Sequence, residues 1–382
     1  MNRRIALAVA AALSVPLAFA APAQAVPGGV SWQADLSTVD GDDARVTFAG
    51  GALRATGAEA GYLVLPPRKL DRRVNRVVAE ARGSGGFEVD VRGRLDGHDW
   101  TEWIPASGGA AVLPAEVTTV QVRVEVADQR SAVTGVRLTA DEAPRALATA
   151  AATPLTYRVF ATREGLTGNQ TANGHVITSR DHFVALPSGR SLSPKGTGDY
   201  TVRVCKTDNS RCEYAPVWDK GPWNTQDDYW NAGRQMWTDL PQGEPEAQAA
   251  YQDGYNGGKD QYGRKVANPA GIDLADGTFW DGLQMPDNGW VDVTYLWTGT
   301  GPTGQVKTAG GPMNVRSAPS TTASVKGLAA NYAKLTIECY VEGDSVTGTH
   351  GTSAIWDRVG PGQYVSDAYL YTGSDKPVAP LC

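Results

Sequence analysis

The sequence predicts a mainly β protein built from several domains. The chain has 382 residues, with 44 glycines and only 4 methionines. Short runs rich in Val, Thr and Tyr recur between turn residues, a pattern that is typical of strands. The length fits two or three domains of about 100–200 residues each.

Residues 1–25 have the pattern of a secretory signal peptide. Arg3 and Arg4 precede an apolar run at 5–20, and Ala-Gln-Ala at 23–25 offers a cleavage site between small residues. No Cys stands at that site, so a lipid anchor is not expected. No later segment approaches the ~20 apolar residues of a membrane span. We therefore expect a secreted, soluble protein without a membrane span.

Residues 26–143 are expected to form a β-sandwich. Segments such as Phe87-Glu-Val-Asp-Val-Arg and Val120-Gln-Val-Arg-Val-Glu-Val alternate apolar and polar residues, as half-buried antiparallel strands do. Residues 144–154, rich in Ala and Thr, are predicted to be a linker.

Residues 155–298 contain four short motifs, in the order Ala172-Asn-Gly, Leu186-Pro-Ser-Gly, Val217-Trp-Asp-Lys-Gly-Pro and Gly271-Ile-Asp-Leu. Together they resemble the Ala-Ser-Gly, Leu-Pro-Phe-Gly, Asp-Arg-Gly-Pro and Ile-Asp-Leu elements of rare lipoprotein A, a family related to the expansins. The resemblance implies a six-stranded double-psi β-barrel with a groove for polysaccharide. It also implies that the partner is peptidoglycan or a related cell-wall polysaccharide.

The resemblance makes Asp219 the first candidate catalytic residue. Asp219 ends an apolar run and precedes Gly-Pro, and Trp218 and Trp223 flank it as candidate substrate-binding residues. Apolar surroundings raise the pKa of a carboxyl, which suits a general acid for a glycosidic oxygen. The alternative is a turn Asp that accepts hydrogen bonds from its own downstream amides.

Asp273 resembles the second aspartate of the family's groove. Its alternative role, which we favour as the primary one, is the N-cap of a short helix through Phe279 and Leu283.

His182 is the third catalytic candidate, because a His precedes the Leu-Pro-Phe-Gly element in rare lipoprotein A. His182 lies one residue further from Leu186 than that spacing, and in a strand such a shift turns the side chain to the other face. The alternative is a surface His beside Asp181.

The range 223–270 is an insertion relative to the compact barrels of the family. Tyr229 and Trp230 in it, with Trp223 at its start, could extend a glycan groove. The alternative, which we favour, is a small apolar core that holds the long loop together. The acidic residues of the insertion lack the spacing of an EF-hand, so neither a metal nor a cofactor is expected.

After a predicted linker at 299–310, residues 311–382 begin with Met313-Asn-Val-Arg-Ser-Ala-Pro-Ser. This segment, with Ala354-Ile-Trp-Asp-Arg-Val and Gln363-Tyr-Val-Ser-Asp-Ala-Tyr-Leu, resembles the bacterial SH3-like domain. The resemblance implies a binding module of wall-associated proteins.

Four cysteines in an exported chain predict two disulfides. Cys205 and Cys212 flank a turn-rich segment between two apolar runs, so a bridge there would clamp a hairpin. Cys339 would then pair with Cys382, since the other pairings would cross domain boundaries. A catalytic thiol requires a His nearby, and none follows Cys205 or Cys212 closely in the sequence.

Charge and missing motifs exclude several functions. The chain has 35 Lys+Arg against 41 Asp+Glu, and removal of the two arginines of the signal peptide takes the formal charge from −6 to −8. That balance argues against binding to nucleic acid. The four histidines show no His-Glu-x-x-His spacing, and no Gly-x-Ser-x-Gly motif is present.

Two classes of function remain. One is an exported protein that binds the cell wall, with a groove in its barrel and an SH3-like targeting module. The other is a peptidoglycan-active enzyme, such as a lytic transglycosylase that uses Asp219, or a wall loosener like the expansins. The shifted His182 and the insertion favour the first class.

Overall fold

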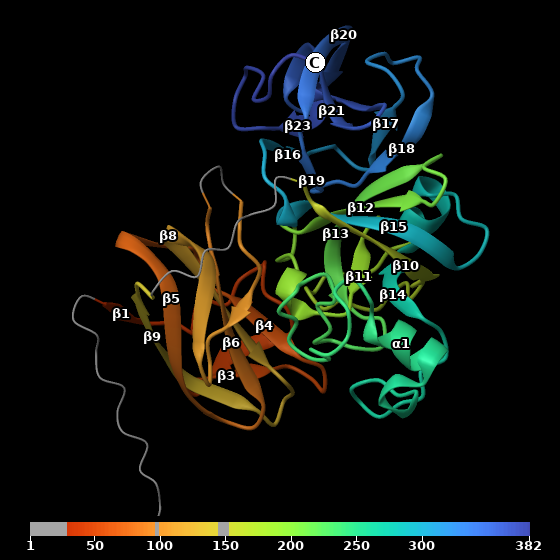
Figure 1. Cartoon of the computed structure of the whole chain (residues 1–382). Coiled ribbons are helices and arrows are strands. Elements are labelled where there is room, and N and C mark those ends of the chain that lie inside the picture. The colour runs from red at the N-terminus through yellow and green to blue at the C-terminus, as the bar shows by residue number, and fades with distance from the viewer. Residues whose placement is uncertain (1–28, 96–98, 144–152) are drawn as a thin grey trace, which may run out of the picture.

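The computed structural model describes residues 29–95, 99–143 and 153–382 (Figure 1). The predicted signal peptide and nearly all of the predicted linker at 144–154 lie outside these residues. The prediction of a mainly β protein is confirmed, since strands dominate from β1 to β23 and the one α-helix in the described part of the chain has 8 residues. Among the described residues, no helix is long and apolar enough to cross a membrane.

The N-terminal part is a nine-stranded antiparallel sheet folded around one apolar core. The paired order is β2-β3-β9-β5-β8-β6-β7, with β1 on β9 and β4 on β8. Val89, Val91, Val122 and Val124 of β6 and β8 face the core, as the alternation predicted. The polar residues between them, Asp90, Arg92, Gln121 and Arg123, are also buried, so these strands are covered on both faces rather than half-buried. The strands are β1 (Val30–Gln33), β2 (Val46–Ala49), β3 (Ala52–Ala55), β4 (Gly61–Val64), β5 (Arg68–Ser84), β6 (Phe87–Gly93), β7 (Ile104–Pro105), β8 (Ala110–Val126) and β9 (Ala132–Asp141).

The central part is a closed six-stranded barrel of mixed direction, which confirms the predicted barrel. Its strands pair in the closed order β11-β14-β10-β15-β12-β13-β11. The β10–β14 and β11–β13 pairs are parallel, and the other four pairs are antiparallel. The strands are β10 (Leu155–Arg163), β11 (Val184–Leu186), β12 (Thr201–Lys206), β13 (Cys212–Lys220), β14 (Ala270–Leu274) and β15 (Gly289–Tyr295).

Short helical segments fill the connections of the barrel. The predicted insertion between β13 and β14 contains α1 (Glu246–Asp253) and η2 (Tyr255–Gly257). The remaining segments are η1 (Gly189–Ser191), η3 (Thr278–Gly282) and η4 (Leu296–Thr298). The insertion thus places its helix beside β14 (Figure 1).

The C-terminal part continues the barrel sheet. Strand β18 pairs with β13 in parallel, and Gly327 lies so close to β13 that a Cβ there would be 1.6 Å from the Cys212 carbonyl oxygen. Only glycine fits that approach. The strands of this part are β17 (Met313–Arg316), β18 (Val325–Ala329), β20 (Cys339–Gly348), β21 (Gly351–Gly360) and β22 (Gln363–Ser366), followed by η5 (Asp367–Tyr369).

A separate three-stranded sheet joins the ends of the C-terminal part. It has the order β19-β16-β23, with β16 (Thr303–Val306), β19 (Lys334–Thr336) and β23 (Leu370–Tyr371). Strand β16 occupies part of the range 299–310, and Val306 in it is fully buried. The segment after the barrel is therefore packed into the C-terminal part rather than extended between parts.

Both predicted disulfides are present. Cys205 and Cys212 are register partners on the neighbouring strands β12 and β13, and their bridge closes the hairpin. Cys339 in β20 is bonded to Cys382, which holds the last residue of the chain against β20. The described residues contain no free cysteine, so the alternative of a catalytic thiol is wrong.

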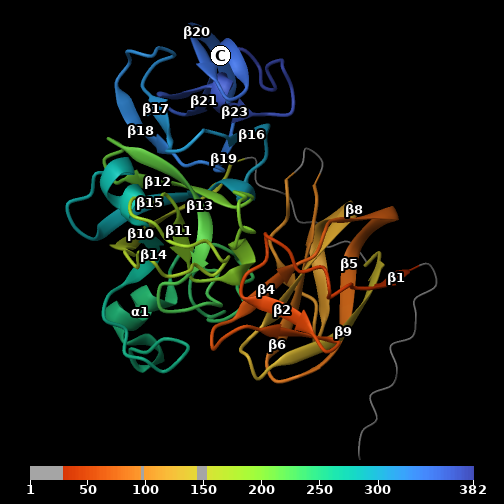
Figure 2. The same cartoon turned by 180° about the vertical axis from the view of Figure 1, so that it is seen from behind.

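The N-terminal sheet packs directly against the barrel, as the two opposite views show (Figures 1 and 2). Trp103 is buried among barrel residues, and its indole N–H donates to the Leu192 carbonyl oxygen at 3.1 Å. Glu102 accepts hydrogen bonds from the indoles of Trp230 and Trp297 at 2.7 and 2.8 Å. The first part of the chain is therefore held against the segment after η1, the insertion and η4 of the central part.

Candidate functional site

The structure brings Asp219 and Asp273 together at one end of the barrel. Asp219 lies near the end of β13, Asp273 lies in β14, and β11 runs between them. Ala185 of β11 is the register partner of both aspartates. Both side chains are partly exposed, whereas Ile272 and Leu274 beside them point into the core. The family-like motifs therefore meet in space as the sequence predicted.

Asp219 is held by two backbone amides. Its Oδ1 accepts from the N–H of Ala172 at 2.8 Å and from the N–H of Lys220 at 2.7 Å. Burial raises the pKa of Asp219, while these hydrogen bonds and the nearby Arg45 favour the ionised form. The bond to Lys220 is the local turn interaction considered for Asp219, and the bond to Ala172 adds a contact with the first family-like motif.

Asp273 does not cap a helix. It lies inside β14, and its Oδ1 accepts a hydrogen bond from the hydroxyl of Thr162 on the parallel neighbour β10. The segment η3 begins only at Thr278, after Gly277. The primary role that we favoured for Asp273 is therefore wrong. Burial, together with the charge of Asp219, raises the pKa of Asp273 to about 7.

A third carboxyl, that of Glu164, joins the two aspartates. Glu164 follows the last residue of β10, and its backbone N–H donates to the Leu274 carbonyl oxygen at 2.8 Å. Burial, with the neighbouring charges of Asp219 and Asp273, raises its pKa to about 10. Its Oε2 is buried and has no hydrogen-bond partner. We call Glu164, Asp219 and Asp273 the carboxylate cluster.

Glu164 was not predicted from the sequence, although a signal was present. The parallel strands β10 and β14 end side by side, so the residue after β10 lies next to the end of β14 and its Asp273. Carboxyls held this close cannot all ionise together, and one proton stays among them near neutral pH. Chemically, the carboxylate cluster can donate a proton to a bound ligand, accept one from it, or bind hydroxyl groups.

His182 does not belong to the carboxylate cluster. Its Nδ1 lies 2.6 Å from Oε1 of Glu213, a fully buried carboxyl, which raises the pKa of His182 against the opposing effect of burial. The alternative of a surface His beside Asp181 is also wrong, because the His182 side chain is only 11% exposed; Asp181 itself bonds to His175 at 2.7 Å. The His near Trp218 is His175, whose ring lies 4.8 Å from the Trp218 ring.

The four candidate aromatic residues pack inside the protein. Tyr229 and Trp230 are fully buried among barrel residues, so their rings have no surface for a ligand. Trp218 is 7% exposed and donates to the Thr197 carbonyl oxygen at 2.8 Å. Trp223 packs against α1, and its indole donates to Asn268 at 3.0 Å. Core packing of the insertion is thus what the structure shows.

A cavity of about 420 Å³ forms a groove in the C-terminal part. Its floor includes Met313, Trp356 and Ser366, which are buried, while Asn314 and the residues 309–311 form exposed edges. Trp356 donates to the Asp344 carbonyl oxygen at 2.9 Å, so its ring is fixed in place. The groove is therefore preformed, with the partly exposed Tyr369 as its aromatic wall and with polar edges.

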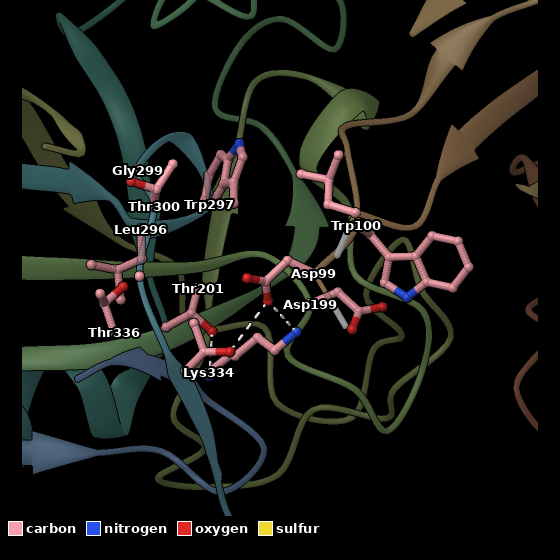
Figure 3. Close-up of a pocket in the computed structure, with 13 residues that line it drawn as sticks. Asp99, Trp100, Asp199, Thr201, Leu296, Trp297, Gly299, Thr300, Lys334 and Thr336 are labelled. Carbon is pink, nitrogen blue, oxygen red and sulfur yellow. Dashed lines mark hydrogen bonds and ion pairs between the residues drawn. The ribbon is translucent and has the colours of Figure 1, made fainter. Parts of the chain in front are cut away.

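A smaller cavity of about 120 Å³ lies where the three parts meet (Figure 3). Lys334 Nζ lies 2.7 Å from Asp99 Oδ1, and Arg92 pairs with Asp199 at 2.9 Å. These ion pairs connect the N-terminal part to the barrel and to the C-terminal part. We assign this cavity to the junction between the parts.

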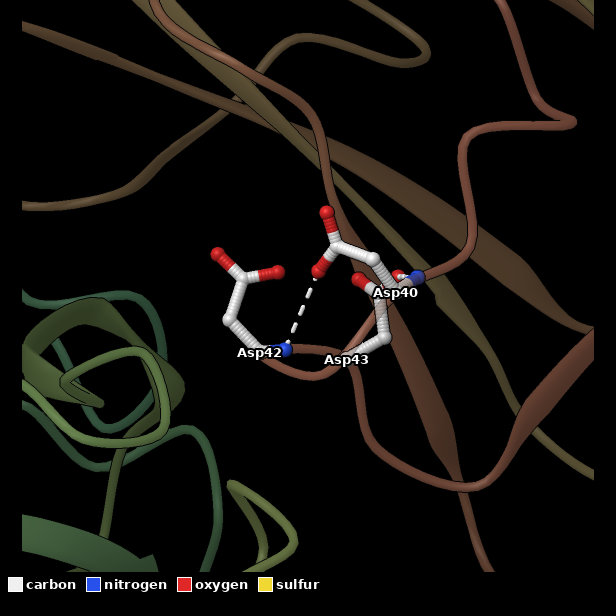
Figure 4. Close-up of side chains that lie close together, drawn as sticks. All are labelled: Asp40, Asp42 and Asp43. Carbon is white, nitrogen blue, oxygen red and sulfur yellow. Dashed lines mark hydrogen bonds between the residues drawn. The ribbon is translucent and has the colours of Figure 1, made fainter.

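Three aspartates, Asp40, Asp42 and Asp43, lie close together in a loop of the N-terminal part (Figure 4). Their nearest carboxyl oxygens fall within 4.8 Å of one another. Each carboxyl oxygen of Asp43 accepts a hydrogen bond at 2.7 Å from a backbone N–H, one from Val64 and the other from Asp40. Burial and the neighbouring acids raise the pKa of Asp42 to about 7. These bonds shape the loop, and we base no metal site on it.

Comparison with known proteins gives a family without a known activity. Residues 155–294, which contain the barrel, match a domain of unknown function, DUF8814. Two relatives are the uncharacterized proteins YraI and YraJ of Bacillus subtilis (strain 168). YraI is 41% identical over 83 residues, which cover 19% of this chain and 69% of the relative. YraJ is 39% identical over 82 residues, which cover 19% of this chain and 70% of the relative. The chain belongs to the family of these two proteins.

Proposed function

We propose that this protein is exported and binds the bacterial cell wall, with the groove of its C-terminal part as the attachment site for peptidoglycan. The observation that carries the proposal is the preformed groove of about 420 Å³ lined by residues between 308 and 369, most of them in the range 311–382. This is the part whose sequence resembles the bacterial SH3-like domain. Concave sites with an aromatic wall and a few polar groups are typical of specific ligand binding.

The charge of the chain also bears on the ligand. The mature protein is acidic, so attraction to the anionic polymers of the wall is not a general electrostatic effect. Affinity must come from shape and hydrogen bonding in a defined site. The groove offers this through Asn314, Thr321 and the backbone of the exposed residues 309–311.

A groove-filling substitution tests the proposal. Asn314 is exposed on β17 and lines the groove, so Asn314→Trp should block it and reduce retention on purified sacculi at least about tenfold. Lys326→Trp, on the neighbouring strand β18 and outside the groove, is the matched control and should bind like the wild type. Equal retention of all three proteins would overturn the assignment of wall binding to this groove.

A second candidate function, cleavage of glycan strands, is favoured by the carboxylate cluster. Burial raises the pKa of Glu164 to about 10 and that of Asp273 to about 7, so a protonated carboxyl is present at neutral pH, as a general acid requires. In this arrangement Asp219, with its two amide donors, is the member best suited to stay ionised. Glu164 is then the proton donor.

The enzyme alternative has its own test. Asp219→Asn and Glu164→Gln should each lower the release of muropeptides from sacculi by about two orders of magnitude. Asp292→Asn, in β15, removes an acid that pairs with Arg158 on the barrel surface and should leave release unchanged. Unchanged release in both cluster variants would rule out the carboxylate cluster as the site of cleavage.

A further inference from the structure

A pair of aromatic side chains lies on the two strands that follow β14 of the carboxylate cluster around the barrel. Trp290 of β15 and Phe160 of β10 are register partners, and their rings pack edge to face with centroids 5.6 Å apart. Their neighbours Val159, Ala161 and Val291 point into the barrel core, so the pair lies on the outer face of the sheet. Trp290 is 39% exposed, an unusual position for a side chain with so much apolar surface.

The same face of β10 leads from this pair to the carboxyls. Thr162 follows Phe160 by two residues, about 6.6 Å along a strand, and therefore points to the same side. Its hydroxyl donates to Asp273. On neighbouring strands, the exposed Trp290 ring is thus followed by the Thr162 hydroxyl and then by the carboxylate cluster.

A second exposed tryptophan shows by contrast what is unusual about Trp290. Trp280 is 40% exposed, but the guanidinium groups of Arg163 and Arg180 lie 4.6 and 4.7 Å from its ring centre. Among the described residues no cation lies over the Trp290 ring. The Arg158 guanidinium on the same face is instead bonded to Asp292 at 2.8 and 2.9 Å. The Trp290 ring is oriented by Phe160, and its exposed side remains available to a ligand.

We propose that Trp290, oriented by Phe160, is a stacking site for one pyranose ring of a neutral glycan whose next unit reaches the carboxylate cluster. A sugar ring presents an apolar C–H face to the indole and hydroxyl groups at its edge, and the carboxyls and Thr162 can bond to such hydroxyls. An anionic ligand is disfavoured because its next unit would meet the three carboxyls of the cluster. The proposal deepens the proposed function and rests on it, since it assigns the barrel a glycan and leaves the C-terminal groove to anchor the protein.

The test uses the full mature chain and chitotetraose, a neutral soluble oligosaccharide. We expect Trp290→Ala to weaken binding in calorimetric titration at least about tenfold, while Trp280→Ala, with equal exposure, changes it less than twofold. In NMR spectra, the indole N–H signal of Trp290 is the one that is missing from Trp290→Phe. This signal should shift when the sugar is added to the wild type.

Three outcomes would overturn the inference: a wild type that does not bind chitotetraose, equal losses in both alanine variants, or a Trp290-dependent dimer without sugar binding. Retention on sacculi, measured with the same proteins, separates this inference from the proposed function. If Trp290→Ala is retained on sacculi like the wild type, attachment through the C-terminal groove stands, whether or not the protein binds chitotetraose. Loss of retention in Asn314→Trp with chitotetraose binding unchanged would show that the two sites act independently.

Discussion

Glu164→Gln should stabilise the protein, and the gain should grow as the pH rises. Burial and the neighbouring acids raise the pKa of Glu164 from 4.5 to about 10. Between these two values the folded chain holds a proton that the unfolded chain has released, so the wild type loses stability with rising pH. Gln has a similar shape and can still donate an N–H to Asp219, but it cannot titrate.

The structure sets the size of this effect. One group with such a shift changes the free energy of unfolding by at most about 1.4 kcal/mol per pH unit. Glu164 is partly exposed and shares its surroundings with two other carboxyls, so we expect about a third of this limit, roughly 0.5 kcal/mol per pH unit. Between about pH 5.5 and about pH 8.5 the advantage of the variant should therefore grow by about 1.5 kcal/mol.

Urea unfolding followed by tryptophan fluorescence at several pH values measures this difference. Glu80→Gln, which changes an exposed glutamate in β5, is the control and should follow the wild type at every pH. Parallel pH dependences of the wild type and Glu164→Gln would refute the argument, because they would mean that Glu164 titrates alike in the folded and unfolded chains.

Further predictions concern the other groups of the barrel and the disulfides. Asp273→Asn keeps an acceptor for the Thr162 hydroxyl. Because the raised pKa of Asp273 costs stability at pH 8, the substitution should not lower the free energy of unfolding there. A loss above about 1 kcal/mol would contradict this expectation. His182→Ala leaves the buried Glu213 without its partner and should cost about 3 kcal/mol in urea unfolding, while retention on sacculi stays unchanged. Replacing Cys339 and Cys382 by Ser should cost about 4 kcal/mol, against about 2.5 kcal/mol for Cys205 and Cys212, because the first bridge closes a longer loop; the reverse order would refute this.

The sequence predicted the barrel and the meeting of Asp219 with Asp273 because each lies in a short motif at the end of a strand. Glu164 escaped notice because Arg163-Glu164-Gly165 looks like a polar strand end at the surface. Its burial depends on the parallel pairing of β10 with β14, which are more than 100 residues apart in the sequence.

The structure agrees with the core role that we favoured for the aromatic residues of the insertion. Tyr229 and Trp230 lie in a segment rich in Asp, Asn and Gln, so glycan binding was the alternative. They are buried because the insertion folds back on the barrel and Trp230 donates to Glu102 of the N-terminal sheet. Trp290, by contrast, sits in a regular strand, and only the pairing of β15 with β10 shows that it faces outward beside Phe160. Local patterns do not contain such long-range contacts.

The helix-cap role that we expected for Asp273 failed for a similar reason. Asp273 precedes a helical segment, and capping was the local solution. In the folded chain the strand continues through Leu274, and the Thr162 hydroxyl across the sheet takes the place of a helix amide as donor.

The domain boundaries proposed at 143, 154, 298 and 310 remain predictions. Limited proteolysis with mass mapping of the fragments is the direct way to place them.

The central claim, attachment to the cell wall, is tested most directly by incubating the mature protein with purified sacculi. Pelleting measures binding, and mass spectrometry of the supernatant measures released muropeptides. We predict that the wild type sediments with the sacculi, that Asn314→Trp stays in solution and Lys326→Trp sediments, and that binding does not require release of fragments. A wild type that stays in solution with sacculi of several wall types would contradict the account.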